Sequence, residues 1–371
     1  MGDRYPVVKV AAVQAASVFL DREGSTQKAC RLIREAGRQG ARVIAFPEGF
    51  IPAHPVWFHH HPATSAIANR LSVELFKNAV EIPGPEIDVL CAAAREANAY
   101  VVMGVCEKLP RTIGTMFNSQ VFIGPDGALI GKHQKIMPTV GERLVHMGGF
   151  GDTFGAVATE FGPVSGLICG ENSNPLAVFA LTAEGSRIHV MSWPNHFPTS
   201  GDPMRNRVAV DSQAFAQMSK AWVVSACGTV DEDMIGKLEV GPAGEKFLRN
   251  PDCCGGSVIV SPMSRVVAGP MGAEEGILYA ECDVAAGIQM KLRHDFAGHY
   301  NRPDIFQLHV NRAAPRIYTV HTAPDALPPA VTPALGAAAT DAPGKGGRTV
   351  RPLPRPRAHR ARLQRKPRGR K

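Results

Sequence analysis

The feature that most constrains this chain is the alternation of short apolar runs with helical segments along its first 310 residues. Apolar runs of strand length occupy 7–16, 41–48 and 100–107, and segments of helical periodicity lie at 25–39 and 86–97. Short apolar runs of this length are typical of strands. The alternation therefore predicts an α/β fold.

A hairpin interrupts this alternation at 119–135, where Gly-Pro-Asp-Gly separates two strand-like halves. Strands and helices alternate again after it. We expect strands in 164–170, 187–193, 221–228, 256–262 and 276–283, and helices from 175, near 204–219 and near 285–294. Strand–helix units combined with hairpins predict mixed sheets.

From about residue 313 the chain consists mainly of Ala, Pro and Arg, with almost no bulky apolar residues. This composition cannot form a packed core, so we predict a folded domain over 1–312 and a disordered basic tail over 313–371. Residues 341–371 hold twelve basic residues and one acidic residue, whereas the rest of the chain holds 29 basic and 32 acidic residues. Nucleic-acid binding is therefore not expected of the folded body. A solvated extension, or out-of-frame translation of a GC-rich gene, explains the tail better than an anionic partner does.

The sequence contains no apolar run long enough to cross a membrane, and its first residues lack the zones of a signal peptide. We therefore expect a cytoplasmic protein without a membrane partner. In that compartment the eight cysteines are expected to be reduced thiols.

Three predicted strands end on a reactive side chain, namely Glu48, Lys135 and Cys169. Each is unremarkable alone, since a buried thiol is usually structural and a glutamate after a strand usually faces solvent. Together they form a coherent chemical set. A carboxylate can take the proton of a thiol whose pKa is about 8.5, and a lysine ammonium can stabilise developing negative charge. The backbone N–H of Gly170 would add a second donor, and attack on a carbon bonded to nitrogen would need no metal or cofactor.

The sequences around these residues resemble the signature blocks of the nitrilase superfamily. The blocks are FPEGFIP (46–52), KHQKIMPTVGERLVHMGG (132–149) and LICGENSNPLAVFALTAEG (167–185). GHYNRPDIFQL (298–308) resembles a C-terminal block of the nitrile-hydrolysing branch. The resemblance extends over about 6–312 and implies a four-layer α-β-β-α sandwich with two mixed sheets.

The resemblance also implies a role for each residue: Glu48 is the general base, Lys135 the electrostatic stabiliser and Cys169 the nucleophile. Glu142 matches a second glutamate that orients the lysine and assists proton transfer, and an ion pair within its own loop is the simpler alternative. The implied reaction converts an organic nitrile into a carboxylic acid and ammonia through a thioimidate and a thioester. An amidase or carbamoylase, or an inactive assembly protein with the same fold, is the alternative. Family members form dimers, which in nitrile hydrolases extend into spirals or filaments.

One position departs from the family pattern. Nitrile-hydrolysing members usually carry tryptophan after the cysteine, where this chain has Gly170. The backbone N–H is kept, so the change affects the expected pocket shape and substrate subclass. The sequence leaves aliphatic, aromatic and arylacetonitrile substrates open.

Other residues are weaker candidates for the site. Trp57, Thr139, Trp193 and His196 are expected to line the substrate pocket, and core packing is an equally good explanation for Trp57. The histidine run 59–61, with His54, lacks a recurring metal spacing, so we expect a structural or channel role and no metal site. Cys253 and Cys254 have no partner pair at zinc spacing, and the glycine-rich stretch 148–155 lacks the setting of a phosphate loop.

Overall fold

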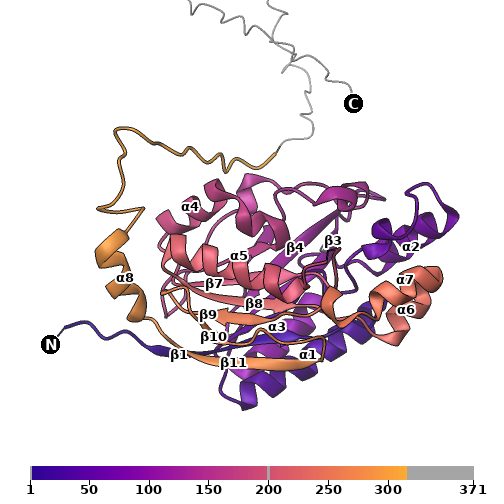
Figure 1. Ribbon diagram of the computed structural model, residues 1–371, viewed down its shortest axis with the longest axis horizontal. Helices are drawn as coiled ribbons and strands as arrows, with labels where there is room; N and C mark the ends of the chain where they lie inside the picture. The colour runs from indigo at the N-terminus through magenta and orange to yellow at the C-terminus, as the bar shows by residue number, and fades with distance from the viewer. Residues whose placement is uncertain (1, 199–200, 316–371) are drawn as a thin grey trace, which may run out of the picture. The chain divides into compact units, whose positions relative to one another are not determined.

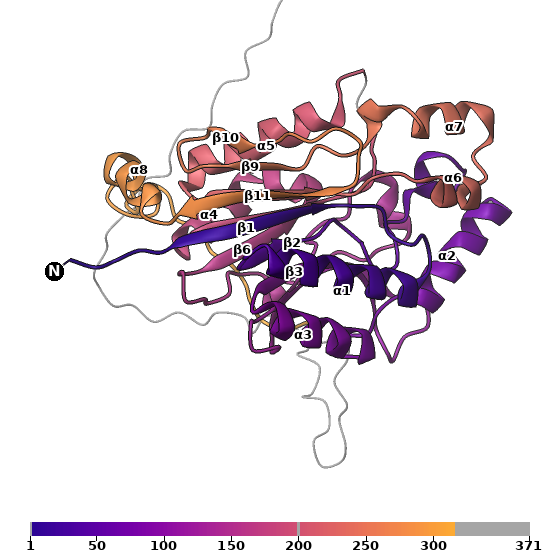
Figure 2. The same cartoon turned by 90° about the horizontal axis from the view of Figure 1, so that it is seen from below.

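A computed structural model of the chain describes residues 2–198 and 201–315. The predicted tail, 313–371, lies outside the described residues from residue 316 onward. Within the described residues two β-sheets pack face to face, and helices cover both outer faces (Figures 1 and 2). This arrangement confirms the α-β-β-α sandwich.

The first sheet has six strands in the order β11-β1-β2-β3-β4-β5. The pairs β1–β2 and β2–β3 are parallel, and the other three pairs are antiparallel. The strand bounds are β1 (Val7–Gln14), β2 (Val43–Ala45), β3 (Tyr100–Lys108), β4 (Met116–Ile123), β5 (Leu129–Gln134) and β11 (Gly276–Asp283). The predicted hairpin is the β4–β5 pair.

The second sheet has five strands in the order β10-β9-β8-β7-β6. Here β6, β7 and β8 are parallel, so their carboxyl ends lie at one edge. The bounds are β6 (Val164–Ile168), β7 (Ile188–Trp193), β8 (Trp222–Cys227), β9 (Val258–Val260) and β10 (Val266–Ala268). Both sheets are mixed, as predicted.

Burial on both faces explains why the strands are mostly apolar. In β1, Val10 and Ala12 pack into the core between the two sheets, while Ala11 and Val13 pack into the core beneath the helices. The helices on the first sheet are α1 (Arg22–Arg38) and α3 (Pro85–Ala97), and those on the second are α4 (Pro175–Ala183) and α5 (Met204–Ser219). A further helix, α8 (Ala286–His294), follows β11.

Three helices occur where none was expected: α2 (Ala66–Asn78), α6 (Glu232–Leu238) and α7 (Gly241–Leu248). The first two begin at side-chain caps, where Ser65 accepts a hydrogen bond from the Ala68 N–H and Asp231 accepts one from the Met234 N–H. Their apolar faces share a small core of their own. Because α6 and α7 are short, their apolar residues repeat too few times for the sequence to predict a helix.

The strand predicted over 41–48 is much shorter, because β2 ends at Ala45. Beyond it the chain leaves the first sheet and bonds to β7 of the second. Ser192 Oγ donates to the Phe46 carbonyl at 2.8 Å, and the Glu48 N–H donates to the Trp193 carbonyl at 3.0 Å. This crossing brings Glu48 to the carboxyl edge of the second sheet.

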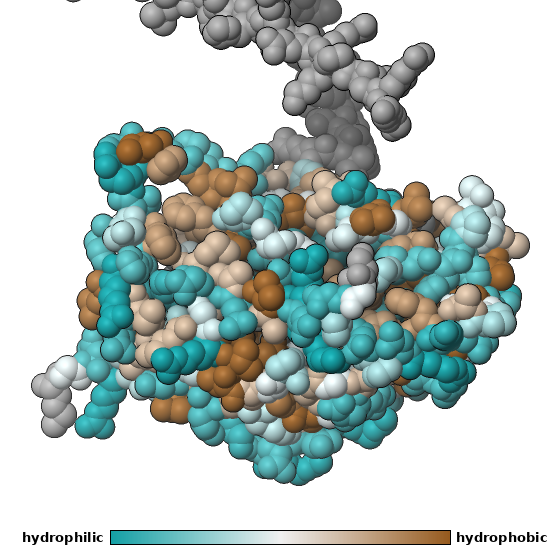
Figure 3. All heavy atoms as spheres, viewed as in Figure 1, coloured by the Kyte–Doolittle hydropathy of each residue, from teal (hydrophilic) through white to brown (hydrophobic). Residues whose placement is uncertain are grey.

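Polar and apolar residues are interspersed on the face shown in Figure 3. Among the described residues, no helix has the length and apolar character needed to span a bilayer.

Candidate active site

Cys169 immediately follows β6 and begins the 3₁₀ turn Cys169–Ser173. Its backbone is left-handed, with φ of 52°. This conformation costs a residue with a side chain about 1–2 kcal/mol, and such strain is concentrated at functional positions. Cys169 is also the one half-buried cysteine, since the other seven are buried. The fold therefore leaves Cys169 partly accessible at the edge of the second sheet.

Glu171 fixes the Cys169 turn to the chain that carries Lys135. Its carboxylate accepts hydrogen bonds from the Ile168 N–H at 2.7 Å and the Ile136 N–H at 2.9 Å, and His133 Nε2 lies 2.6 Å from it. Sequence reasoning missed this residue. Its place three residues after Ile168 was the available signal, because a carboxylate there can cap a short turn.

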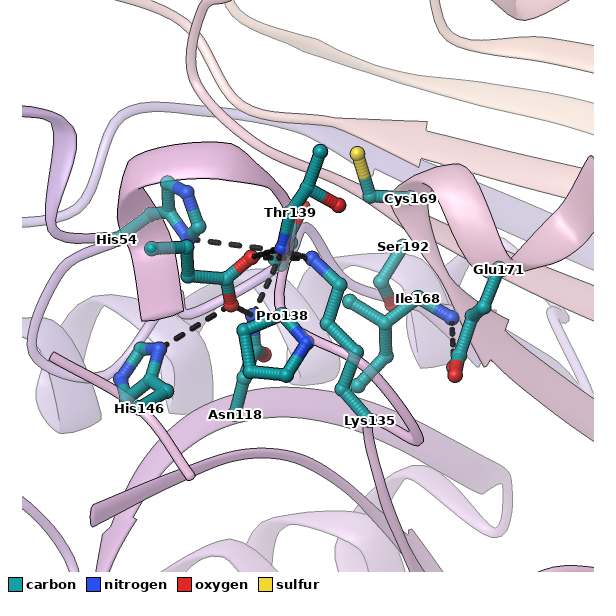
Figure 4. Close-up of polar contacts among 12 residues, drawn as sticks. His54, Asn118, Lys135, Pro138, Thr139, His146, Ile168, Cys169, Glu171 and Ser192 are labelled. Carbon is teal, nitrogen blue, oxygen red and sulfur yellow. Dashed lines mark hydrogen bonds and ion pairs between the residues drawn. The ribbon is translucent and has the colours of Figure 1, made fainter. Parts of the chain in front are cut away.

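Lys135 follows β5 and is 1% exposed. Its Nζ donates to Glu48 Oε1 and to Glu142 Oε2, each at 2.7 Å (Figure 4). Burial alone would lower the pKa of Lys135, but the negative charges of Glu48 and Glu142 and the hydrogen bond to Glu142 outweigh it and raise the pKa. Lys135 is therefore a permanent cation, and one of its three N–H groups remains for a ligand.

Glu48 is buried, and only one of its carboxylate oxygens is bonded. Oε1 accepts from Lys135 and, at 2.6 Å, from Asn118 Nδ2, whereas Oε2 has no hydrogen-bond partner among the described residues. Burial raises the pKa of Glu48 to about 7, with a smaller contribution from the charge of Glu142, while Lys135 opposes the rise. Glu48 can therefore exchange a proton near neutral pH.

Glu142, in the 3₁₀ turn Val140–Leu144, is held by four donors. Its carboxylate accepts from Lys135, the Thr139 N–H and Asn118, and His146 Nδ1 lies 3.1 Å from Oε1 (Figure 4). Burial acts to raise the pKa of Glu142, but the Lys135 ammonium and the His146 contact lower it well below its ordinary value. Glu142 is therefore ionised and balances the lysine.

Asn118 on β4 joins the two glutamates. Its Nδ2 donates to Glu48 at 2.6 Å and to Glu142 at 2.7 Å, so one amide group fixes the spacing of both carboxylates. The residue is completely buried. Sequence reasoning missed Asn118, and the available signal was a polar residue inside an apolar strand of a hairpin.

The Cys169 thiol is held protonated by its surroundings. Burial raises its pKa well above the ordinary value and the negative charge of Glu48 adds to this, while Lys135 and the hydrogen bond from the Gly170 N–H act in the opposite direction. A neutral thiol beside a carboxylate of pKa about 7 can lose its proton to that carboxylate during attack.

A cavity of about 510 Å³ lies at this cluster, and Glu48 is not among its lining residues but bonds to Lys135, which is. Its lining includes the predicted residues Lys135, Thr139, Glu142, Cys169, Gly170, Trp193 and His196. Trp57 is not among the lining residues. It is 1% exposed, packs in the core shared with α2 and donates from Nε1 to Ser72 Oγ at 3.2 Å, while the neighbouring Phe58 lines the cavity.

Histidines form part of the cavity wall. His54, His59 and His196 line it, and His60 Nε2 lies 3.2 Å from His196 Nε2. Burial lowers the pKa of all four, to about 4 for His59, so their rings are neutral at pH 7. These histidines thus offer neutral donors and acceptors to the cavity and add no charge to it.

Glu48, His54 and Glu142 also place ligand atoms within 4.8 Å of one another. The donor set does not favour a divalent cation, because the Lys135 ammonium already bonds to both carboxylates. A metal ion there would face a fixed positive charge at contact distance.

Comparison with known proteins agrees with this geometry. Residues 9–291 match the family model described as carbon-nitrogen hydrolase. "Nitrilase 2" from an unidentified prokaryote is 35% identical over 311 residues, which cover 84% of this chain and 95% of that protein. The aliphatic nitrilase of Sinorhizobium fredii is 36% identical over 82% of this chain and 95% of its own length. The arylacetonitrilase of Aspergillus niger is 32% identical over 83% of this chain and 93% of its own length.

Solved structures share the fold at lower identity. The NitFhit protein of C. elegans superimposes with a TM-score of 0.63 at 18% identity, over 85% of this chain and 70% of that one. An amidase from Nesterenkonia sp. AN1 gives a TM-score of 0.56 at 17% identity, over 78% of this chain and 95% of that one. With the family match over most of its length and nitrilase relatives above 30% identity, the chain belongs to the carbon-nitrogen hydrolase family, in the branch of these nitrilases.

Proposed function

We propose that this protein hydrolyses an organic nitrile to a carboxylic acid and ammonia. The observation that carries the proposal is one site in which a half-buried Cys169 with a left-handed backbone shares a cavity with Lys135, which bonds to a Glu48 carboxylate of pKa about 7. The nitrilase relatives support a nitrile as the substrate class.

In the first half of the reaction, Glu48 accepts the thiol proton as Cys169 attacks the nitrile carbon. The C–S bond forms, one π bond of the C≡N group breaks, and the nitrogen takes a proton to give a thioimidate. The free N–H of Lys135 and the backbone N–H of Gly170 stabilise the developing negative charge. Glu142 holds Lys135 in place for this role and assists proton transfer.

In the second half, Glu48 activates water, which adds to the thioimidate carbon. The tetrahedral intermediate expels ammonia, and a second water hydrolyses the remaining thioester to release the acid and the thiol. The sum is one nitrile and two waters converted to one carboxylic acid and one ammonia. If the tetrahedral intermediate expels the thiol before ammonia, an amide is released as a side product.

Amide hydrolysis by an amidase or carbamoylase is the second candidate, since the same groups can attack an amide carbon and the Nesterenkonia amidase shares the fold. A matched nitrile and amide pair separates the two functions. Nitrile hydrolysis predicts ammonia and acid from the nitrile at a kcat/KM well above that for the amide. Turnover of the amide alone would assign the protein to the second candidate.

Replacement of the thiol tests the mechanism directly. Cys169→Ala should lose turnover and keep its circular dichroism spectrum and Tm, while Cys91→Ala, in α3 and away from the cavity, should keep activity. Intact-mass measurement should detect a covalent adduct with a slow nitrile substrate in the wild type and none in Cys169→Ala. Retained turnover in Cys169→Ala, or an inactive wild type without an adduct, would support the inactive assembly protein instead.

We further infer a cytoplasmic protein in which 1–312 is the catalytic domain and 313–371 a basic tail. The family resemblance supports a homo-oligomer built from dimers that extends into spirals or filaments. Light scattering and electron microscopy of the full chain test this assembly, and a monomer at micromolar concentration would contradict it.

A further inference from the structure

A second cavity, of about 330 Å³, lies at the amino ends of β7 and β8. The active-site cavity lies at the carboxyl end of β7, where Trp193 lines it. Six strand residues separate the two ends, a distance of roughly 17 Å at about 3.3 Å per residue. We call the second cavity the basic cleft, because Arg187, Lys220 and Lys291 line it against one carboxylate, Asp295.

The strand register brings two of the three cations together. Arg187 precedes β7, Lys220 lies two residues before β8, and the Trp222 N–H donates to the Arg187 carbonyl at 3.0 Å. The helix α8 then covers this edge and supplies Lys291. Close packing of α8 depends on Gly287, where an added Cβ would lie 3.1 Å from the Lys220 carbonyl oxygen.

Lys220 is a buried ammonium without a counter-ion. It is 3% exposed, and across 2–198 and 201–315 no carboxylate oxygen lies within 4.0 Å of its Nζ. Nζ donates to the Gln217 carbonyl at 2.5 Å and lies 5.6 Å from the ring centre of Phe296. This bond caps the C-terminus of α5 and uses one of the three N–H groups of the Lys220 ammonium. Lys220 is also the left-handed C-cap residue of α5, with φ of 59°.

The other two cations are also available to a ligand. Arg187 makes no ion pair within the described residues, and its guanidinium lies 5.5 Å from the ring centre of Tyr5, which holds its plane at the cleft. Lys291 is 3.8 Å from Asp295, the cleft's only carboxylate. Three cations among the described lining residues thus face one anion, and burial makes the unbalanced charge costly at Lys220, whereas Arg187 and Lys291 are half-buried.

We propose that the basic cleft binds a small oxyanion, a carboxylate or a phosphate group, held by Lys220, Arg187 and Lys291. Arginine presents a planar fork that matches either group, and the two lysines add point charges. The volume fits an ion of the size of phosphate or a four-carbon dicarboxylate. The site is separate from the thiol and does not depend on the reaction proposed above.

Calorimetric titration of the full-length protein tests the cleft, with inorganic phosphate and succinate used separately in Tris buffer at constant ionic strength. At least one ion should bind with one site per chain. Lys220→Met should weaken binding about tenfold or more, because a charge-assisted hydrogen bond is lost from a buried site. Binding of phosphate alone assigns a phosphate group, binding of succinate alone assigns a carboxylate, and binding of both assigns the shared oxyanion chemistry.

Two control variants locate the ion. Lys246→Met, an exposed lysine of α7 outside any ion pair within the described residues, should bind as the wild type does, and so should Arg207→Gln, a cation of the active-site cavity. If Lys220→Met does not fold, Arg187→Gln and Lys291→Gln decide the question by the same tenfold criterion. The proposal is overturned if neither ion binds, if Lys246→Met weakens binding as much as the cleft variants do, or if only Arg207→Gln removes it.

Discussion

Glu48 and Glu142 accept hydrogen bonds from the same two donors, Lys135 and Asn118, yet their pKa values are shifted in opposite directions. Glu142 receives additional contacts from the Thr139 N–H and from His146, whereas Glu48 keeps one oxygen free. One ammonium therefore holds one carboxylate ionised and leaves the other able to titrate. Pairs of carboxylates with separated pKa values are a common basis for acid–base roles.

The first prediction concerns pH. Only ionised Glu48 can accept the thiol proton, so kcat/KM for a nitrile should fall as pH drops through about 7. Turnover about one unit below this pKa should be roughly tenfold lower than on the plateau. Initial rates of ammonia release at a series of pH values, corrected for reversible unfolding, measure this fall in kcat/KM. A flat profile through neutral pH would show that Glu48 is not the titrating base.

The second prediction separates activity from stability at Glu48. Glu48→Gln should lower kcat by about a hundredfold to ten-thousandfold, because an amide cannot accept the proton. Its Tm should equal or exceed that of the wild type, because glutamine has no charge to desolvate and Lys135 keeps Glu142. Thermal unfolding and ammonia release on the same preparation measure both effects. A large loss of Tm would assign Glu48 a structural role instead.

Glu142→Gln, unlike Glu48→Gln, should reduce the stability of the protein. Removing the ionised partner of a buried lysine should reduce the free energy of unfolding by about 2–4 kcal/mol. The pKa of Glu142 is lowered in the folded state, so its contribution is present above the unfolded pKa of about 4.3 and declines as pH falls below that value. Urea unfolding at neutral and acid pH should therefore show a difference from the wild type that narrows in acid. An unchanged difference at both pH values would contradict the ionised state of Glu142.

The predicted strand ends at Glu48, Lys135 and Cys169 were enough to propose one site, because the three residue types form one chemical set and their sequences resemble the nitrilase signature blocks. Periodicity could not show how they meet, since the preceding strands β2, β5 and β6 belong to two different sheets. Asn118 and Glu171 could not be predicted in the same way. Each acts through partners on a distant segment, and apolar periodicity carries no information about which polar groups meet across strands. Trp57 illustrates the opposite limit, since its sequence neighbour Phe58 is the one that lines the cavity. A shift of one residue reverses which side chain faces a site.

The next prediction concerns Asn118, which influences the pKa of Glu48 through a hydrogen bond. The bond from Asn118 lowers the pKa of Glu48, so its loss in Asn118→Ala should move the acid limb of kcat/KM to higher pH. Activity should recover partly on the alkaline side of the profile. Asn78→Ala, on α2, serves as the control and should leave the limb in place. A uniform loss at every pH would indicate general disruption of the site.

The final prediction concerns the two glycines beside the catalytic groups, Gly170 and Gly104. A Cβ at Gly170 would meet only Thr139 Oγ1, at 3.5 Å, whereas a Cβ at Gly104 would lie 2.0 Å from the Pro47 carbonyl oxygen. Gly170→Ala should therefore change the free energy of unfolding by no more than about 0.5 kcal/mol, and Gly104→Ala should cost about 1–3 kcal/mol and displace Glu48.

Gly170→Trp extends the comparison from stability to specificity. The ring would occupy part of the 510 Å³ cavity beside Cys169, so kcat/KM for a branched or aryl nitrile should fall about tenfold relative to a small aliphatic nitrile. Gly104→Ala should lower kcat/KM for both nitriles alike, because it moves Glu48 and leaves the cavity wall unchanged. Paired kinetics with the two nitriles measure the ratio. Two outcomes would contradict this role of Gly170: an equal loss of kcat/KM for both nitriles in Gly170→Trp, or a Tm of Gly170→Ala below that of Gly104→Ala. Either would show that Gly170 is needed for the turn itself and does not set the size of the substrate.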